Sequence, residues 1–425
     1  METLIFDMPY DDTLFKIELP KSNVLCTLEQ KHNNFRKLTT SDIEISLNNP
    51  INSKSLSDLL HIKKPNNIVI VVNDITRPTP YKSFLQTILN YIESCGFSKK
   101  QITLLIATGI HRPNSHKENI KSFGEYIANN YNIINHNPDA DLEAVGTLSD
   151  GQTLIINKYA AQSDFLITTG QINLHYFAGF SGGRKSILPG IASRKMITEN
   201  HARMNEPGSA SGSIENNPVH KTMIEAATLA RVDFNINVVL NDKKDILSIF
   251  SGDLESSWFK GVELSRSMST TIINEKADVT IASAGGFPKD INLYQAQKAI
   301  EHAAIATKSG GYIVLFASCK ELYGEEKFEQ WITETNGWDE VFAKFEKEFE
   351  LGGHKAFALA RSLYDKTLFI ITDMSDEVVS NCNMIKIAKF EEALDIINSK
   401  EKNWKCYIMP DGSSILPVIG GNCND

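Results

Sequence analysis

Cysteine is scarce in this sequence, and no two cysteines stand close together. The six in 425 residues are Cys26, Cys95, Cys319, Cys382, Cys406 and Cys423. This spacing excludes a disulfide-dense scaffold and disfavours a zinc site built from cysteines. We therefore expect reduced thiols and a cytoplasmic protein.

Two further absences limit the range of partners. The sequence has no apolar run of membrane-spanning length, and METLIFDMPYDD lacks the basic start and apolar core of a signal peptide. Basic residues number 43 against 52 acidic ones, and the net charge of −9 argues against broad nucleic-acid binding. We expect neither a membrane nor a nucleic acid as partner, and the sequence leaves the oligomeric state open.

What the sequence does contain is a succession of strand-like runs, each followed by a polar loop and a helix. The run IVIVV (68–72) is continuous and β-branched, as in parallel strands that are covered on both faces. Further runs of this kind lie at 102–107, 164–169, 234–240, 279–283, 312–318, 367–372 and 405–409. Alternating strands and helices predict the α/β class with largely parallel sheets.

The length predicts more than one core, and the polar stretch SMSTTIINEKAD indicates a boundary near 265–275. We predict an N-terminal α/β domain over residues 1–270, which begins with a short antiparallel piece, and a C-terminal α/β domain over 271–425. Unusual residues occupy the loops at 73–80, 108–118, 170–190 and 284–292. Ligands bind beyond the carboxyl ends of strands in such sheets, so these loops predict an active-site cleft between the domains.

The most distinctive stretch runs from Gly170 to His201, GQINLHYFAGFSGGRKSILPGIASRKMITENH. It places Gly182 and Gly183 directly before Arg184 and Lys185. Glycines let the backbone approach a ligand closely because they carry no Cβ. The adjacent positive charges of Arg184 and Lys185 favour binding of an anion. The lysine is either a phosphate-binding cation or an amine nucleophile.

This stretch differs from a P-loop at one decisive position. Gly179 begins a six-residue approach to Lys185, but a P-loop has glycine immediately before the lysine and this sequence has Arg184. A bulky side chain there obstructs the close wrap of backbone around phosphate. The sequence therefore disfavours a P-loop phosphotransferase, while a phosphate-bearing ligand still fits.

Three histidines stand near these charged residues. His111 follows the strand 102–107 in TGIHRP, where acid–base work near neutral pH suits an imidazole. His175 and His201 flank the lysine, and a structural role is the alternative for each histidine. No second histidine, cysteine or carboxylate stands at chelating spacing near His201, so any metal there needs non-protein ligands.

The segment NDITRPTP places Asp74 and Arg77 just after the strand 68–72. Arginine recognises a carboxylate or phosphate through two parallel hydrogen bonds, and the flanking prolines stiffen its loop. The alternative is a surface arginine bound to Asp74.

In the C-terminal domain, the pattern predicts a helix over 293–309 with Asp290 as its N-cap. Gln295 and Lys298 then lie one turn apart on the same face. A lysine near a helix start is unfavourable to the helix dipole, which indicates an anionic partner.

Taken together, five motifs resemble the nickel-dependent lactate racemase family. DITRPTP, TGIHRP, HYFAGFSGGRKSILPG, the following ENH and GGFPKDINLYQAQKA occur in this order within roughly residues 68–300. The resemblance implies two α/β domains with the active site between them. It also implies a nickel pincer nucleotide (nickel pyridinium-3,5-bisthiocarboxylic acid mononucleotide) as cofactor, and hence nickel.

The resemblance implies a role for each candidate residue. Lys185 would tether the cofactor through a thioamide bond, and His201 would complete the coordination of nickel. His111 and His175 would be the paired acid–base catalysts. The substrate carboxylate would be bound by Arg77, Gln295 and Lys298. The cofactor would be contacted by Asp74, Gly182, Gly183 and Arg184, unless Asp74 instead fixes the position of Arg77.

The implied activity is that of an isomerase, a racemase or epimerase of small 2-hydroxy acids. One histidine would take the hydroxyl proton while hydride passes from Cα to the cofactor, and hydride would return to the opposite face of the keto acid. The alternative is a non-catalytic protein that binds or carries the nickel nucleotide.

One segment departs from the lactate-type pattern. LGGHKAFALARS (351–362) occupies a region where lactate enzymes are expected to bring an aromatic side chain near the methyl group. We predict that His354, Lys355 or Phe357 shapes a pocket for a larger or more polar acid.

Overall fold

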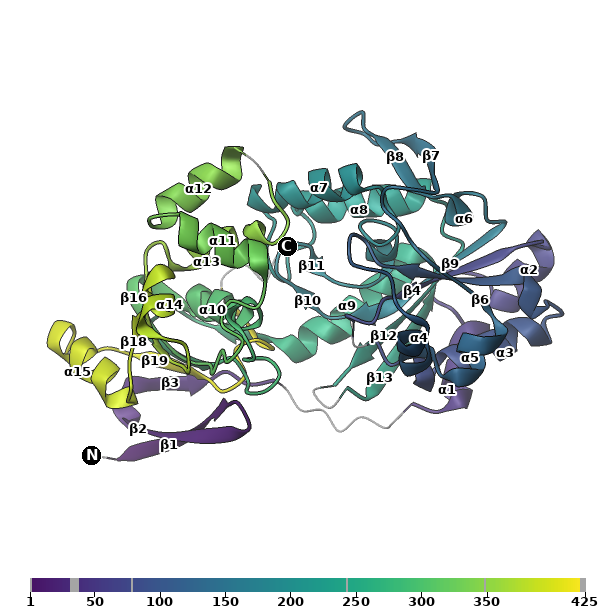
Figure 1. Cartoon of the computed structure of the whole chain (residues 1–425). Coiled ribbons are helices and arrows are strands. Elements are labelled where there is room, and N and C mark those ends of the chain that lie inside the picture. The colour runs from purple at the N-terminus through teal and green to yellow at the C-terminus, as the bar shows by residue number, and fades with distance from the viewer. Residues whose placement is uncertain (1, 31–37, 78, 242–243, 348, 421–425) are drawn as a thin grey trace. The chain divides into compact units, whose positions relative to one another are not determined.

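The chain folds into two compact units (Figure 1). The computed structural model describes residues 2–30, 38–77, 79–241, 244–347 and 349–420. Unit 1 comprises residues 1–32 and 268–425, and unit 2 comprises residues 33–267. Each unit has a six-stranded sheet with helices, so the predicted α/β class is confirmed. No helix in the described ranges is both long and apolar enough to cross a bilayer.

Unit 2 is organised around one nearly parallel sheet. Its strands, in spatial order, are β13 (Ile246–Gly252), β12 (Phe234–Leu240), β9 (Phe165–Ile172), β4 (Ile68–Asn73), β5 (Ile102–Ala107) and β6 (Asn132–Asn135). Only the edge strand β13 is antiparallel to its neighbour. The helices are α1 (Thr40–Asn48), α2 (Leu56–Lys63), α3 (Leu85–Ser94), α4 (His116–Phe123), α5 (Glu125–Asn130), α6 (Lys158–Ala161), α7 (Arg194–Ala202), α8 (Pro218–Leu229) and α9 (Leu254–Ser269).

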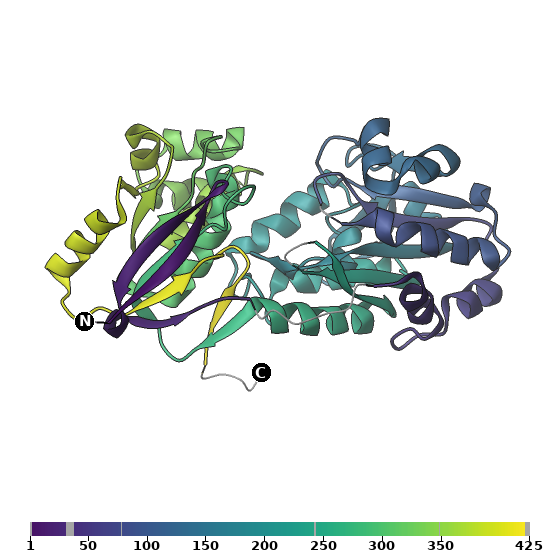
Figure 2. The ribbon, with the colours of Figure 1, turned by 90° about the horizontal axis from the view of Figure 1, so that it is seen from below.

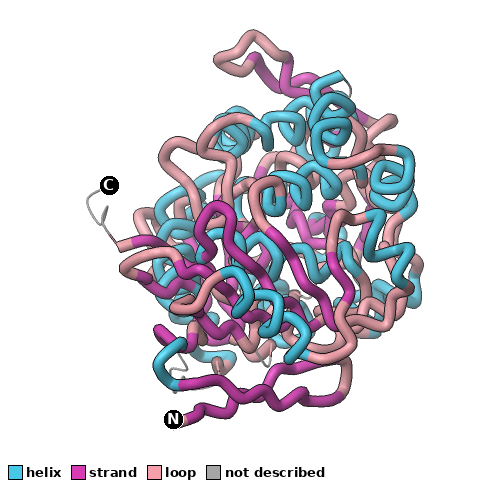
Figure 3. Tube along the Cα trace, turned by 90° about the vertical axis from the view of Figure 1, so that its left-hand side faces the viewer, coloured by secondary structure: helices cyan, strands magenta, loops and turns pink. Residues whose placement is uncertain are grey.

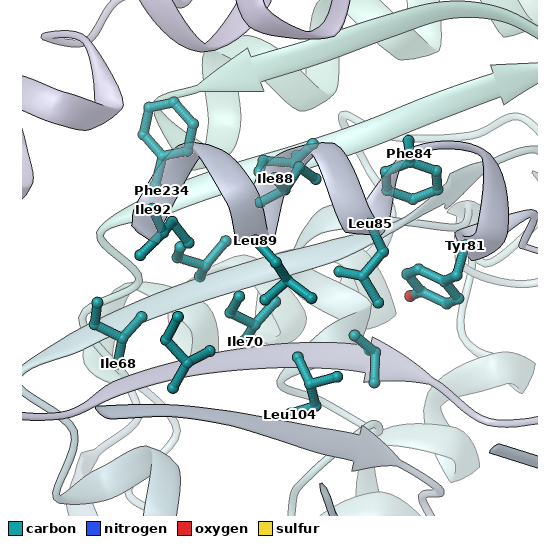
Figure 4. Close-up of a cluster of buried hydrophobic side chains, with 14 of the residues drawn as sticks. Ile68, Ile70, Tyr81, Phe84, Leu85, Ile88, Leu89, Ile92, Leu104 and Phe234 are labelled. Carbon is teal, nitrogen blue, oxygen red and sulfur yellow. The ribbon is translucent and has the colours of Figure 1, made fainter. Parts of the chain in front are cut away.

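The predicted continuous strand at 68–72 is buried because helices cover the sheet. Figure 4 shows Ile68 and Ile70 of β4 beneath α3, whose Leu85 and Leu89 point toward them. All four side chains are fully buried. This apolar layer makes the sheet a rigid support for the loops at its carboxyl edge.

Unit 1 has a second six-stranded sheet, and all its strands are parallel. In spatial order they are β18 (Ile385–Lys386), β17 (Thr367–Ile371), β16 (Thr307–Phe316), β15 (Ala277–Ser283), β19 (Cys406–Met409) and β3 (Val24–Thr27). The helices are α10 (Leu293–Ala306), α11 (Glu326–Glu334), α12 (Trp338–Lys347), α13 (Gly353–Leu363), α14 (Asp376–Asn381) and α15 (Phe390–Lys400). Figure 3 shows these strands in magenta, and β14 (Thr270–Ile273) pairs with β20 (Leu416–Ile419) beside them.

The start of the chain belongs to unit 1, which differs from the predicted domain of residues 1–270. The hairpin of β1 (Thr3–Tyr10) and β2 (Thr13–Pro20) lies along this sheet in Figure 2, and its buried side chains join the same hydrophobic core. Strand β3 then pairs with β19. The local sequence does not reveal this assignment, because the partner strand follows almost 400 residues later.

Helix α10 begins at Leu293 as predicted, but its N-cap and its last residue differ from the prediction. Its N-cap is Asn292, whose side chain accepts a hydrogen bond from the backbone N–H of Gln295 at 3.0 Å. Asp290 instead accepts from the backbone N–H of Asp11 at 2.7 Å. The helix ends at Ala306 because Thr307 already begins β16.

The order of strands reverses once in each sheet, and both reversals lie beside predicted site loops. In unit 2 the reversal is between β4 and β9, which precede the loops of Asp74 and Lys185. In unit 1 it is between β15 and β19, and β15 leads into α10. Ligands bind at such switch points because the loops diverge there.

Candidate active site

Asp74 and His111 form a hydrogen-bonded pair at the carboxyl edge of the unit 2 sheet. The buried Asp74 Oδ2 accepts a hydrogen bond from His111 Nδ1 at 2.8 Å. Its Oδ1 accepts from the hydroxyl of Thr76 at 2.8 Å. A neutral imidazole that donates from Nδ1 keeps a lone pair on Nε2, so His111 is set up as a base. The carboxylate thus contacts a histidine, a partner that the sequence-based analysis did not assign to it.

His175 lies within bonding distance of Lys185. Its Nε2 is 3.0 Å from Lys185 Nζ, and its Nδ1 accepts a hydrogen bond from the backbone N–H of Ala178 at 3.3 Å. An accepting Nδ1 carries no proton, so in the neutral ring the proton is on Nε2. The lysine must then accept that proton's hydrogen bond, which requires a neutral amine with a free lone pair.

The electrostatics of this pair agree with that assignment. Burial lowers the pKa of Lys185 well below its usual value, and the charges of Arg184 and Arg77 lower it further. Burial and the neighbouring Lys185 likewise lower the pKa of His175 well below 6.5. His175 is therefore neutral at pH 7, and the lowered pKa of Lys185 favours its neutral amine, which is the nucleophilic form of lysine.

His201 occupies the last turn of α7 and presents one ring nitrogen. Its Nδ1 donates to the carbonyl oxygen of Ile197 at 2.8 Å, which leaves Nε2 as a lone-pair donor. Burial, and then Lys185, lower the pKa of His201 to about 3, so the ring stays neutral. A backbone-anchored neutral imidazole is a common metal ligand. Within the described ranges, no group of three or more histidine, cysteine or acidic side chains could hold a metal ion.

The buried ring of Phe177 links these residues. Its centroid is 4.7 Å from that of His175, 5.1 Å from that of His201 and 5.6 Å from Lys185 Nζ. No role was predicted for this ring from the sequence, although its place inside the HYFAGF motif is a signal. Phe177 fixes the spacing of the two imidazoles and the amine.

Arg77 adds positive charge to the same region. Its backbone N–H donates to the carbonyl oxygen of Asp74 at 3.1 Å, and its charge lowers the pKa values of His175 and His201. The structure thus brings Arg77 together with the histidines and Lys185 in unit 2.

Arg184 lies behind the lysine loop. Its side chain is fully buried and donates to the carbonyl oxygen of Ala178 at 2.8 Å and to Nδ1 of His220 at 3.0 Å. The guanidinium carbon also lies 3.9 Å from the ring centroid of Trp258. This arrangement shows that the Arg184 side chain supports the lysine loop from within, and its contact with the cofactor stays a prediction.

Packing within the protein explains why two glycines occupy this loop. Gly182 and Gly183 have φ values of +80° and +51°. A Cβ would meet Asn237 Oδ1 at 2.9 Å on Gly182 and the Trp258 ring at 2.8 Å on Gly183. The absence of side chains is therefore required by the turn and by the residues behind it, whatever the backbone faces on its other side.

The remaining predicted residues lie in unit 1. Gln295 and Lys298 stand in the first two turns of α10. His354 and Lys355 are buried at the start of α13, whereas Phe357 stacks on Phe345 at 4.1 Å between centroids. Phe357 thus belongs to an aromatic cluster, and the His354 ring joins the same cluster through Phe349, at 6.0 Å between centroids.

Asn200, the middle residue of the ENH motif, is a further candidate for which the sequence predicted no role of its own. It is 1% exposed, and within the described ranges neither Oδ1 nor Nδ2 has a hydrogen-bond partner. Buried amides are normally bonded, and this one precedes His201 directly. It offers one donor and one acceptor to a polar ligand.

Comparison with known proteins identifies the family. The lactate racemase N-terminal domain matches residues 10–212, and the lactate racemase C-terminal domain matches residues 272–417. The lactate racemase of Thermoanaerobacterium thermosaccharolyticum is 36% identical, covering 96% of this chain and 98% of the relative. The chain belongs to the lactate racemase family. The predicted resemblance is therefore confirmed, and the protein is an enzyme of the isomerase class, a racemase.

Further lactate racemase family comparisons agree. The lactate racemase of Lactiplantibacillus plantarum is 34% identical, with 96% of this chain and 99% of the relative covered. The structure of the lactate racemase apoprotein from T. thermosaccharolyticum superposes with a TM-score of 0.90 at 34% identity, covering 98% of this chain and all of that one. A Thermotoga maritima protein at 18% identity has a TM-score of 0.63 over 91% of this chain and all of its own, which shows the fold alone.

Proposed function

We propose that this protein racemises lactate or a closely related 2-hydroxy acid, and that unit 2 holds a nickel pincer nucleotide for this reaction. The observation that carries the proposal is the buried Lys185 amine, 3.0 Å from Nε2 of His175, with the Phe177 ring in contact with this amine and with the His201 ring. Its two relatives named lactate racemase support the substrate.

The residues of unit 2 fit this cofactor. A neutral buried amine suits the covalent tether that we assign to Lys185, and Nε2 of His201 suits nickel. The unbonded amide of Asn200 offers a donor and an acceptor for polar groups of the nucleotide. When bound, the cofactor would supply a hydride acceptor, so that Cα is inverted without a carbanion beside a carboxylate.

The protein's own contribution is to hold and move protons. His111 presents a lone pair on Nε2 and would accept the substrate hydroxyl proton, while Asp74 stabilises the imidazolium that forms. His175 presents N–H on Nε2, and an acylated Lys185 nitrogen would no longer compete for it as a base. One histidine thus begins as the base and the other as the acid, which is the pair that inversion of a hydroxy acid requires.

The substrate carboxylate needs cationic and hydrogen-bonding partners. We assign this role to Arg77, Gln295 and Lys298, the residues that the family resemblance implies for it. Arginine binds carboxylates through two parallel bonds, and lysine through a compact charge.

The test uses single enantiomers of lactate in heavy water with nickel-loaded protein. We expect inversion without deuterium at Cα, because the hydrogen never leaves as a solvent-exchangeable proton. Extensive deuterium incorporation would rule out the hydride route. Normal nickel loading without inversion of any 2-hydroxy acid would favour the alternative, a non-catalytic nickel-nucleotide binder.

A further inference from the structure

Helix α13 carries a buried lysine that the proposed reaction does not use. Lys355 stands in the first turn of the helix and is 3% exposed. Burying an amine is costly unless its contacts compensate, so the partners of Lys355 reveal what the side chain does.

The first partner is an amide on α10. Lys355 Nζ donates to Gln297 Oε1 at 2.7 Å, and Gln297 Nε2 donates to Glu301 Oε2 at 3.2 Å. Arg361, two turns further along α13, lies 3.6 Å from the same carboxylate. A chain of polar contacts therefore ties α13 to one side of α10.

The second partner is an aromatic ring on α10. Lys355 Nζ lies 5.0 Å from the ring centroid of Tyr294, within the range of a cation–π contact. Phe328 packs edge-on against the same ring at 5.9 Å between centroids. The tyrosine ring is thus held on two sides, and it stands next to Gln295 and four residues before Lys298.

We propose that Lys355 is a positioning residue for the carboxylate-binding face of α10, which we define as Tyr294, Gln295 and Lys298. Lys355 holds Tyr294 by its ring and Gln297 by its amide, so it sets the direction in which the neighbouring side chains point. The proposal rests on the proposed function in taking the ligand of this face to be the substrate carboxylate.

The amine of Lys355 also titrates near neutral pH. Burial, and then the charge of Lys298, lower the pKa of Lys355 to about 7, while Glu301 acts in the opposite direction. The other titratable or charged groups on the two helices are Tyr294, whose ring faces the amine, Arg361, which lies near Glu301, and His354, the preceding residue. A protonated Lys355 binds the ring face more strongly, so the face of α10 is best held below pH 7.

The experiment compares Lys355→Met with Lys308→Met, a matched change at an exposed lysine of unit 1 that pairs with Asp278. In nickel-loaded enzyme we expect Lys355→Met to raise KM for lactate about tenfold and to change kcat less than threefold. Wild-type KM should rise between pH 7 and 8.5, and this rise should be absent in Lys355→Met. An unchanged KM, or a loss confined to kcat, would overturn the proposal.

A second readout does not depend on turnover. Hydrogen exchange should speed up at least threefold in peptides covering residues 293–301 of Lys355→Met and stay unchanged in Lys308→Met. If wild-type protein fails to racemise but this difference is found, the proposed function falls and the positioning role stands. If racemisation is normal and neither KM nor exchange changes, the positioning role falls. Should Lys355→Met not fold, Gln297→Leu removes the same hydrogen bond and serves in its place.

Discussion

Arg184 Nε donates a hydrogen bond to Nδ1 of His220 at 3.0 Å, and both side chains are buried behind the lysine loop of unit 2. The same guanidinium holds loop carbonyls and stacks on Trp258. Burial lowers the pKa of Arg184 to about 9, which still leaves it charged at neutral pH. A cation thus fixes the loop from within, at the residue that immediately precedes Lys185.

Arg184→Lys should weaken this support, because an ammonium cannot reproduce the planar fork of donors. We expect a loss of about 1–3 kcal/mol of unfolding free energy from buried groups left unbonded. Cofactor attachment at Lys185 should also fall. Chemical denaturation and intact mass measure the two effects. Arg194→Lys, at an exposed ion pair with Asp139, is the matched control and should change neither.

Asp74→Asn should impair proton transfer by His111. The amide is neutral, so it no longer stabilises the imidazolium, and it can present a donor to Nδ1. We expect kcat/KM for racemisation to fall roughly 100-fold or more, with nickel content unchanged. Thr76→Val keeps the carboxylate–histidine contact and should lose far less activity. Equal losses in the two variants would contradict the role of Asp74.

His201→Ala should lose nickel, whereas His111→Ala and His175→Ala should retain it and lose racemisation. Of these three histidines, we assign only His201 to the metal. Its Nδ1 donates to the backbone at Ile197, which leaves Nε2 for nickel. Nickel per polypeptide, measured by elemental mass spectrometry on protein purified in parallel, distinguishes the three. A similar loss of nickel from all three variants would refute the division of roles.

The nickel-free protein should become less stable as the pH falls below about 6.5, in part through His136. Its Nε2 donates to the carbonyl oxygen of Ala192, and burial lowers its pKa to about 4. The unfolded chain binds this proton at higher pH, so protonation favours unfolding between pH 6.5 and 4.

For this histidine alone, the loss between pH 7.5 and 5 is about 2 kcal/mol. Urea unfolding of wild type and His136→Gln at the two pH values measures it. The variant should show a smaller dependence on pH, while His61→Gln, at an exposed histidine, should behave like wild type. Identical pH dependence in all three proteins would reject the role of His136.

The sequence by itself determined the fold class, the family and the chemistry-bearing loops. Continuous apolar runs such as 68–72 predict parallel strands, because adjacent residues of a strand point to opposite faces of the sheet and both faces must then be buried. Asp74 and His111 lie in the loops directly after such strands, and Lys185 lies in the longer loop after β9, so their place at a sheet edge could be predicted from order along the chain alone.

Only the tertiary structure decided which side chains meet. The pairing of β3 with β19 and the contacts of Asp74 with His111, of Arg184 with His220 and of Lys355 with Tyr294 join segments distant in sequence. Hydrophobic periodicity reports whether a residue faces a core, and it carries no information on the partner across that core. The protonation states of Lys185 and His175 follow from burial and from single hydrogen bonds, and these exist only once the chain has folded.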